Sequence, residues 1–490
     1  MTQEGKDIRS ITEDRCCGCA GCVNACPVGA ITMEEGAEGF LFPVINPGIC
    51  IHCGKCYRVC PVSEQAEKEP FPHNRQPECY AAASRDGIRM QSSSGGIFQV
   101  IARRILAEGG SVYGAAWQEN LTVGHICVKS LEDLPKLSGS KYVQSRIGKI
   151  YRQILEELNQ GKKVLFSGTP CQNAGLRRFL GKTCEGLVTV DIVCHGVPSE
   201  RLFQTYLEQV HGREQVEAVS FRTKEFGHTC SNGIVTLKNG KKKVITSGED
   251  PYERGFHKSL FLRRSCYGCL YAAPPRAADF TLGDFWGLEK YNPSLKDERG
   301  VSLVLLNTEK AEKLWRELSG ELVLCEKVPL DVALKNNRFR KTIRRQGARE
   351  RFFRLLPVLG IEKAVTDTME NHYDLQLVYH GQDDREALEQ ELEQEANRLG
   401  RTVCLSGHPE ASWEMSAEGL EEILKGRRPG ELSEEERKQL EKLLCREPDF
   451  WAKSKKAARM AVHRAALEAR EHLSSEMKER LKSLLRGKSR

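Results

Sequence analysis

The sequence predicts an α/β protein with three parts: a cysteine-rich N-terminal domain, a central domain built on a mixed, mostly parallel sheet, and a C-terminal helical extension. Nine of the 20 cysteines lie between Cys16 and Cys60. From Cys79 to about Pro357, strand-like and helix-like segments alternate, which is typical of a sheet covered by helices. Beyond about residue 380 the pattern is helical only. A chain of 490 residues is long enough for about two to four domains.

The composition excludes several classes of protein. A hydrophobic content of 40% supplies a real core, so a disordered chain is excluded. Apolar runs such as Val301–Leu306 are far shorter than the roughly 18 residues that cross a bilayer, and residues 1–15 are too polar for a signal peptide. The net charge of +7 is mild and does not indicate nucleic acid binding. Two evenly spaced groups of cysteines are unlike a secreted disulfide framework, so we expect a cytoplasmic metal-cluster protein.

Apolar periodicity and turn residues mark the elements of the central domain. Isoleucine recurs at every fourth position from Ile97 to Ile105, between a run of serines and Gly109-Gly110, which predicts a helix over 96–108. The other elements expected before the hairpin are strands over 111–116, 164–167 and 187–193, and helices over 149–160 and from the turn at 168–170 through 177.

A hairpin is expected over 233–246, because Asn239-Gly240 is a strong turn signal between two strand-like runs. Strands that alternate with helices form a largely parallel sheet, so the hairpin is expected as an antiparallel addition to that sheet. In the C-terminal extension the expected helices are 383–395, 433–444 and 457–485.

The cysteines of the N-terminal domain repeat one spacing twice. Cys16-x2-Cys19-x2-Cys22-x3-Cys26-Pro is followed by Cys50-x2-Cys53-x2-Cys56-x3-Cys60-Pro. This is the spacing of bacterial ferredoxins with two [4Fe-4S] clusters, in which the fourth cysteine of each run binds the other cluster. We therefore assign two ligand sets: cluster I is bound by Cys16, Cys19, Cys22 and Cys60, and cluster II by Cys50, Cys53, Cys56 and Cys26.

Two zinc knuckles are the alternative to this assignment. Zinc takes four thiolates at one site and has no use for the Cys-x3-Cys-Pro repeat, so the sequence favours iron–sulfur clusters. Small residues beside the ligands, such as Gly18 and Ala20, let backbone amides approach the sulfurs. Cys17 breaks the spacing and is expected to be a bystander.

Four further cysteines stand where a ligand site would form. Cys171 and Cys194 each follow an expected strand, and loops after neighbouring parallel strands emerge at one edge of a sheet. Cys266 and Cys269 form a Cys-x2-Cys pair. Together the four supply enough soft ligands for a third [4Fe-4S] cluster or a zinc ion.

Three other interpretations of these four cysteines stay open from the residues alone. Cys171 could be a nucleophile with His195 nearby. Cys266 and Cys269 could be a redox pair, and all four could be ordinary buried cysteines.

Several short motifs occur in order along the central domain and carry a family resemblance. They are Ser93-Ser-Gly-Gly-Ile97, Gly110-Ser-Val-Tyr-Gly-Ala115, Ser140-Lys-Tyr-Val-Gln-Ser145, Gly168-Thr-Pro-Cys-Gln172, Cys194-His-Gly-Val-Pro198 and Asp279-Phe-Thr-Leu-Gly-Asp-Phe-Trp-Gly287. With the ferredoxin repeat, these motifs resemble the coenzyme F-420 hydrogenase/dehydrogenase beta-subunit family. The resemblance covers about residues 12–345 and leaves residues 380–490 outside it.

The resemblance implies an iron–sulfur flavoprotein that moves electrons between clusters and a two-electron partner, in some members the deazaflavin coenzyme. By the same resemblance, Cys171, Cys194, Cys266 and Cys269 are expected as ligands of the third cluster. The residues expected near FAD are Ser94, Gly95, Gly96, Lys141, Tyr142, Thr169 and Gln172.

The residues alone support a flavin site less strongly than they support the iron–sulfur clusters. Serines, glycines and free amides at the start of the helix after Gly96 are a site for a pyrophosphate, and Lys141 adds a positive charge. A plain serine cap with no ligand is the alternative. The chain has no Gly-x-Gly-x-x-Gly motif, so an ordinary nicotinamide site is not supported.

These observations lead to a functional hypothesis: an oxidoreductase that passes electrons between two ferredoxin clusters, a third cluster and FAD, which exchanges hydride with a small molecule or a deazaflavin. The alternative is a non-catalytic electron-transfer or scaffold subunit. A redox partner protein or ferredoxin is expected, and the basic segment 335–354 is either its docking site or a solvated face. We divide the chain into a ferredoxin domain (1–62), a linker (63–78), two parts of the flavoprotein domain (79–160 and 161–360) and the extension (361–490).

Overall fold

The computed structural model describes residues 6–68, 76–224, 232–339, 348–370, 374–377, 402–405 and 414–415. The chain forms two compact units, Met1–Val365 and Thr366–Arg490. The first unit holds the N-terminal domain and the central domain, and it contains every residue that the sequence singled out as a ligand or cofactor neighbour.

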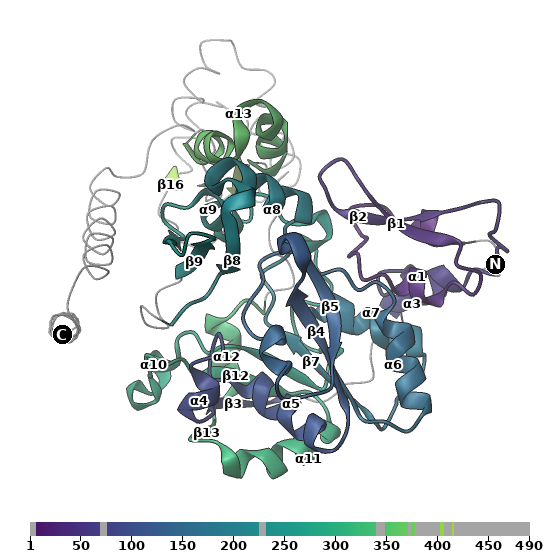
Figure 1. Ribbon diagram of the computed structural model, residues 1–490, viewed down its shortest axis with the longest axis vertical. Helices are drawn as coiled ribbons and strands as arrows, with labels where there is room; N and C mark the ends of the chain where they lie inside the picture. The colour runs from purple at the N-terminus through teal and green to yellow at the C-terminus, as the bar shows by residue number, and fades with distance from the viewer. Residues whose placement is uncertain are drawn as a thin grey trace, which may run out of the picture. The chain divides into compact units, whose positions relative to one another are not determined.

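The N-terminal domain is a two-stranded antiparallel hairpin with short helices beneath it (Figure 1). Its elements are the 3-10 helix η1 (Ile8–Ser10), α1 (Gly21–Ala25), β1 (Ile31–Glu35), β2 (Leu41–Ile45), α2 (Lys55–Arg58) and α3 (Glu64–Lys68). Helices α1 and α2 each contain the third cysteine of one run, Cys22 and Cys56. The expected linker begins as helix α3, with Ser63 and Ala66 buried.

The central domain is built on an eight-stranded sheet of order β13-β3-β12-β11-β7-β6-β4-β5. Its strands are β3 (Glu78–Ala83), β4 (Ser111–Trp117), β5 (Val123–Val128), β6 (Val164–Gly168), β7 (Leu187–Ile192), β11 (Phe280–Asp284), β12 (Ser302–Leu306) and β13 (Leu324–Lys327). Strands β11, β7, β6 and β4 are parallel and form the centre. The outer pairings are antiparallel, so the mixed sheet is confirmed and its parallel part is the middle.

Helices cover both faces of this sheet, as Figure 1 shows. On one face, α5 (Ile97–Ala107) and α11 (Glu309–Leu318) pack on the strands, and the three isoleucines of α5 are fully buried in that core, as their spacing predicts. On the other face, α6 (Ile150–Asn159) and α7 (Pro170–Leu180) pack on β4, β6 and β7. Central strands covered on both faces explain the continuous apolar runs of the sequence.

The predicted hairpin exists but belongs to a second sheet. Strands β9 (Asn232–Leu237) and β10 (Lys242–Thr246) pair antiparallel, and β8 (Val216–Ser220) adds to β9. The expectation that the hairpin adds to the main sheet is therefore wrong. Its strand β9 pairs instead with β8, which the sequence analysis did not identify, and the three strands form a sheet of their own. This sheet lies beside α8 (Glu200–Tyr206) and α9 (Pro251–His257) (Figure 1).

The remaining described helices are short except for one. They are α4 (Asp86–Arg89), α10 (Leu288–Tyr291), α12 (Leu330–Asn336) and the longer α13 (Ala348–Glu370). No helix within the described ranges is both long and apolar enough to cross a bilayer.

The second unit was expected to be helical. Its described residues are the last turn of α13, residues 366–370, and three short parallel strands, β14 (Asp374–Leu377), β15 (Thr402–Leu405) and β16 (Glu414–Met415). The expected helices 383–395, 433–444 and 457–485 lie outside the described residues.

Candidate metal and cofactor sites

The two cysteine runs of the N-terminal domain share one backbone conformation. In the first run, Gly18 and Ala20 have φ of 67° and 56°; in the second, His52 and Gly54 have φ of 53° and 66°. The left-handed conformation costs a residue other than glycine roughly 1–2 kcal/mol, so Ala20 and His52 are strained. Strain of this kind persists where the surrounding structure requires one loop shape. The repeat in sequence is thus also a repeat in loop geometry.

The cysteines assigned to cluster I lie together and are buried. The pKa of the Cys60 thiol is raised to about 12, mainly by burial and in part by the nearby thiol of Cys16, and both cysteines line one small cavity. Burial also raises the pKa of Cys22, with Cys16 and Cys60 as the next contributions. Cys60 from the second run therefore lies among thiols of the first run, which is the crossed arrangement that the spacing predicts. Metal binding would have to displace the protons of these thiols.

The cysteines assigned to cluster II lie closer to the surface. Cys26 and Cys56 are buried, Cys50 is half-buried and Cys53 is exposed. The Ala30 amide donates to Cys26 Sγ at 3.1 Å, which is the kind of contact that stabilises a thiolate ligand.

No three His, Cys, Asp or Glu side chains within the described ranges are grouped closely enough to hold a single metal ion. In a [4Fe-4S] cluster each thiolate binds a different iron atom. A set of cluster ligands therefore does not have to meet at one point, and the residues present fit a cluster.

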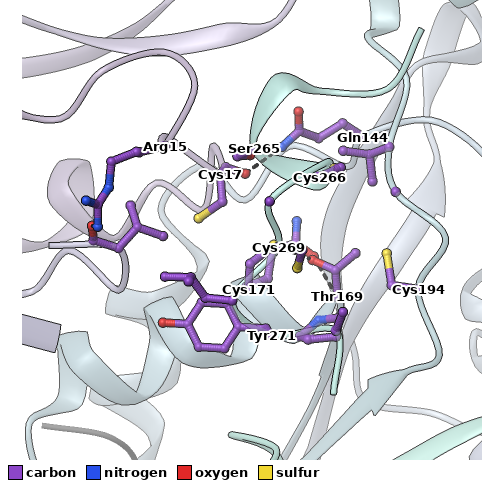
Figure 2. Close-up of a pocket in the computed structure, with 18 of the residues that line it drawn as sticks. Arg15, Cys17, Gln144, Thr169, Cys171, Cys194, Ser265, Cys266, Cys269 and Tyr271 are labelled. Atoms are coloured by element: carbon purple, nitrogen blue, oxygen red, sulfur yellow. Dashed lines mark hydrogen bonds between the residues drawn. The ribbon is translucent and has the colours of Figure 1, made fainter. Parts of the chain in front are cut away.

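The four cysteines of the central domain that are expected as ligands line one cavity of about 310 Å³, which we call the third cavity. Figure 2 shows them entering it from three separate segments of the chain. We call them the third cysteine set: Cys171, Cys194, Cys266 and Cys269. The proximity has an electrostatic consequence: the pKa of Cys194 is raised to about 12, mainly by burial and then by the thiols of Cys171 and Cys269.

The sheet positions the first two members of this set. Strands β6 and β7 are parallel neighbours, so the loops that follow them meet at one edge, as expected. Cys171 lies in the first turn of α7, and Thr169 and Gln172 form a capping box around it. The Thr169 hydroxyl lies 3.2 Å from Cys171 Sγ. Cys194 lies just beyond the end of β7.

The structure argues against Cys171 as a nucleophile. A nucleophilic thiol needs a lowered pKa. The Cys171 pKa is instead raised well above its ordinary value, by the neighbouring Cys17 thiol and by burial. His195 does not assist it, because its Nε2 lies 2.7 Å from Phe256 O and 3.1 Å from Ser259 Oγ.

The N-terminal domain and the third cysteine set meet at helix α7. A Cβ atom at Gly175 would lie 2.8 Å from Cys19 Sγ, so only glycine lets the cluster I loop approach this closely. Gly175 is one helical turn after Cys171. Cys17, expected as a bystander, is buried and lines both the third cavity and the cavity beside the cluster I cysteines. Its side chain faces the third set from the N-terminal loop (Figure 2).

The residues expected near FAD fall into two groups. Thr169 and Gln172 lie beside Cys171 and line the third cavity. The turn at Ser94–Gly96 lies at the start of α5: Ser94 Oγ donates to Val301 O at 3.0 Å, and the Gly95 amide donates to Ser302 Oγ at 2.9 Å.

Lysines lie on both sides of this turn. Ser140, next to Lys141, donates through its amide to Ser93 Oγ, and Lys141 Nζ donates to Ser138 O at 2.7 Å. Lys224, which sequence reasoning missed, donates to Ser94 O at 2.5 Å. Neither lysine has an ion pair with a carboxylate of the described residues, and burial lowers the pKa of each to about 8. Two half-buried cations that form no ion pair within the described residues fit a phosphate-bearing ligand.

Tyr142 lies in an aromatic cluster next to Lys141. Its ring stacks on Phe256 at 4.4 Å and on Phe221 at 4.9 Å between ring centres. No polar contact of the described residues links Tyr142 to the Ser94–Gly96 turn directly.

Part of the basic segment 335–354 is structural. Arg349 of α13 is fully buried and donates to both carboxylate oxygens of Glu38, in the turn between β1 and β2, at 2.7 and 2.5 Å. Arg264 also binds Glu38, at 2.7 Å. The expectation of a solvated or docking face therefore does not apply to Arg349, because its guanidinium holds the N-terminal hairpin. Residues 340–347 lie outside the described part of the chain.

Comparison with known families matches two regions of the chain. Residues 161–329 match the family of the C-terminal region of coenzyme F420 hydrogenase/dehydrogenase beta subunits. Residues 15–63 match the 4Fe-4S dicluster domain. The ferredoxin-type domain predicted from the cysteine spacing is confirmed.

Similar proteins include a subunit of the F(420)H(2) dehydrogenase of Methanosarcina mazei, 25% identical over 194 residues, which are 37% of this chain and 53% of that protein. The coenzyme F420-dependent sulfite reductase of Methanocaldococcus jannaschii is 25% identical over 344 residues, 68% of this chain and 50% of that protein. The chain thus spans about half the length of these relatives. A solved structure of the F420-reducing [NiFe] hydrogenase complex from Methanosarcina barkeri aligns with 70% of this chain and 99% of its own, at 17% identity and a TM-score of 0.38.

Proposed function

We propose that this chain, which belongs through residues 161–329 to the coenzyme F420 hydrogenase/dehydrogenase beta-subunit family, passes electrons between ferredoxin-type [4Fe-4S] clusters and FAD. When bound, the clusters would supply one-electron transfer, and the flavin would exchange two electrons, as hydride, with a small molecule or a deazaflavin coenzyme. The relatives whose names include F420 support the deazaflavin as the two-electron partner.

The observation that carries this proposal is the arrangement around helix α7. Its first turn directs Cys171 into the third cavity, and its next turn places Gly175 against Cys19 of the cluster I set. Helix α7 therefore carries one expected ligand of the third cluster and, about one helical turn later, contacts an expected ligand of cluster I. Cys171, Cys194, Cys266 and Cys269 would hold the third cluster and relay electrons between cluster I and the flavin.

The flavin assignment is supported by the Ser94–Gly96 turn. The N-terminus of α5 offers free amides, and Lys141 and Lys224 offer positive charge on two sides. These groups would bind the FAD pyrophosphate. Both lysines are half-buried, so each charge would be less screened by water than that of an exposed lysine.

A redox partner, such as a ferredoxin or another subunit, would exchange electrons with cluster II, whose ligand Cys53 is exposed. The alternative function is an electron-transfer or scaffold subunit that carries clusters but no flavin. In that case the extension 361–490 would be an assembly element.

Anaerobic purification followed by iron, sulfide and flavin analysis tests the proposal. We expect about 12 iron atoms per chain, matched by acid-labile sulfide, together with one FAD. About eight iron atoms and no flavin would favour the electron-transfer subunit. Tightly bound zinc without sulfide would contradict both functions.

A further inference from the structure

A buried arginine joins the cluster I loop to the central domain. Arg263 is 1% exposed. Its Nε donates to Cys16 O at 2.6 Å, and its Nη2 donates to Leu41 O at 2.9 Å. Its Nη1 donates to Gln144 Oε1 at 3.0 Å. Nη2 also points to Cys16 Sγ at 3.5 Å, so the guanidinium touches both the backbone and the sulfur of an expected cluster ligand.

The charge of Arg263 has no carboxylate partner among the described residues. Its polar contacts are with carbonyl oxygens, an amide oxygen and a thiol, and its guanidinium lies over the Phe42 ring at 4.4 Å. A buried charge is costly unless it is paired. A [4Fe-4S] cluster with four thiolates is anionic, so cluster I would supply the missing counter-charge.

The backbone of Arg263 is hydrogen-bonded to the segments that carry Cys194 and Cys266 of the third cysteine set. Its amide donates to Val197 O at 2.8 Å, beside the Cys194 loop, and its carbonyl accepts from the Cys266 amide at 2.9 Å. Its partner Gln144 donates in turn to Cys17 O at 3.0 Å. Arg263 is therefore fixed by the third site and directed toward cluster I.

The cluster II cysteines have a different environment. Two cations lie beside the cluster II cysteines. Arg9 is 61% exposed and lies 2.5 Å from an oxygen of Asp7, while half-buried Arg152 donates to the carbonyl oxygen of Cys26. Within the described residues neither cation has a hydrogen bond to a cluster II sulfur, whereas Arg263 lies 3.5 Å from Cys16 Sγ. An exposed, paired cation is also screened by water and by its own carboxylate, so the effect of Arg9 on a cluster is small.

We propose that Arg263 is a positioning residue that raises the reduction potential of cluster I above that of cluster II. Reduction adds a negative charge to an already anionic cluster, and a buried cation with a hydrogen bond to the ligand sulfur stabilises the reduced form more than the oxidised form. The electron is thereby favoured on the cluster that adjoins the third set. This inference rests on the proposed function, since it requires iron–sulfur clusters at the two ferredoxin sites.

The test is a redox titration of the anaerobically prepared full chain, followed by electron paramagnetic resonance. The signals of clusters I and II are assigned with Cys60→Ser and Cys53→Ser. Arg263→Gln should shift the potential of cluster I to a lower value and leave that of cluster II unchanged, with the same iron and sulfide content. Arg264→Gln is the matched control, because it removes the same charge one residue away, from a side chain bound to Glu38.

Arg263→Lys separates charge from hydrogen bonding and serves if the glutamine variant does not retain iron. It should give a smaller shift in the same direction, because a lysine keeps the charge but cannot reach all four acceptors. An unchanged cluster I potential in an iron-replete Arg263 variant, or an equal shift in Arg264→Gln, would overturn the inference. Absence of clusters from the unmodified chain would instead overturn the proposed function.

Discussion

The two cysteine runs of the N-terminal domain have the same spacing and the same loop conformation, but their surroundings differ. The cluster I set is buried against the central domain, with Gly175 and Arg263 in contact with its ligands. Around the cluster II set, Cys53 is exposed and two large apolar side chains next to Cys50, Ile49 and Ile51, are also exposed. The spacing gives both runs the same loop geometry, while their surroundings differ. In the proposed function, cluster I has the inner role, next to the third cysteine set, and cluster II has the outer role, next to a redox partner.

The inner role of cluster I requires that the third cysteine set binds a cluster that can exchange electrons with it. Cys171→Ser should remove up to about four iron atoms per chain, because a hydroxyl is a harder and weaker ligand for cluster iron than a thiolate. The ferredoxin clusters should stay reducible by dithionite, which iron analysis and electron paramagnetic resonance would show. Cys194→Ser and Cys269→Ser should behave in the same way. Iron content unchanged in all three variants would mean that the third set binds no cluster.

The inner role of cluster I also depends on the ion pairs that hold the β1–β2 hairpin. Glu38→Gln leaves the buried Arg349 guanidinium uncompensated and should destabilise the protein by about 3 kcal/mol, measured by denaturant unfolding. Glu13→Gln, at an exposed site of the same domain, is the control.

The same ion pairs predict a pH dependence. Burial alone would raise the pKa of Glu38, but Arg349 and Arg264 outweigh it and hold the pKa below its ordinary value. The stabilisation is therefore present above about pH 4.3, the usual glutamate pKa, and is lost as the pH falls through the lowered pKa. If Glu38→Gln were as stable as the unmodified chain at pH 7, these ion pairs would not hold the hairpin.

Close packing on α7 distinguishes the inner run from the outer one. Gly175→Ala places a methyl group against Cys19 Sγ and should cost about 2 kcal/mol, as overpacking usually does. Electron transfer from cluster I to the third set, followed by stopped-flow absorbance, should slow. Gly320→Ala is the control, since a Cβ there meets nothing within 4 Å. Equal behaviour of the two variants would show that the two sites are not in close contact.

The outer role of cluster II can be tested at its exposed apolar neighbours. Ile51 is 59% exposed, and Ile51→Ser should raise the KM for a ferredoxin donor roughly tenfold, because a buried apolar contact at an interface is worth over 1 kcal/mol. Val323, also 59% exposed but in the central domain, gives the matched control Val323→Ser. Dithionite, a small reductant, should reduce both variants at the same rate. A KM change in both variants, or in neither, would place the docking surface elsewhere.

The secondary structure near the site was predictable where the signals are local. The helix from Ile97 follows from the spacing of its isoleucines, and the strand at 187–192 follows from its apolar run. The β9–β10 hairpin of the second sheet was predicted from its turn, but β8 was missed because its pattern is weak, and no local signal shows that the three strands form a separate sheet. The strands of the second unit were missed for the same reason.

The sequence by itself determined the ferredoxin-type domain and predicted its ligands, because the spacing of Cys16 through Cys26 is a local property that a short loop reproduces. Only the tertiary structure decided which other groups meet these ligands. Arg263 and Cys16 are 247 positions apart, and no periodicity signals that the guanidinium of one would touch the sulfur of the other. Lys224 is likewise brought to Ser94 from 130 positions away. Charge and burial depend on such long-range contacts, so they exist only once the sheet has formed.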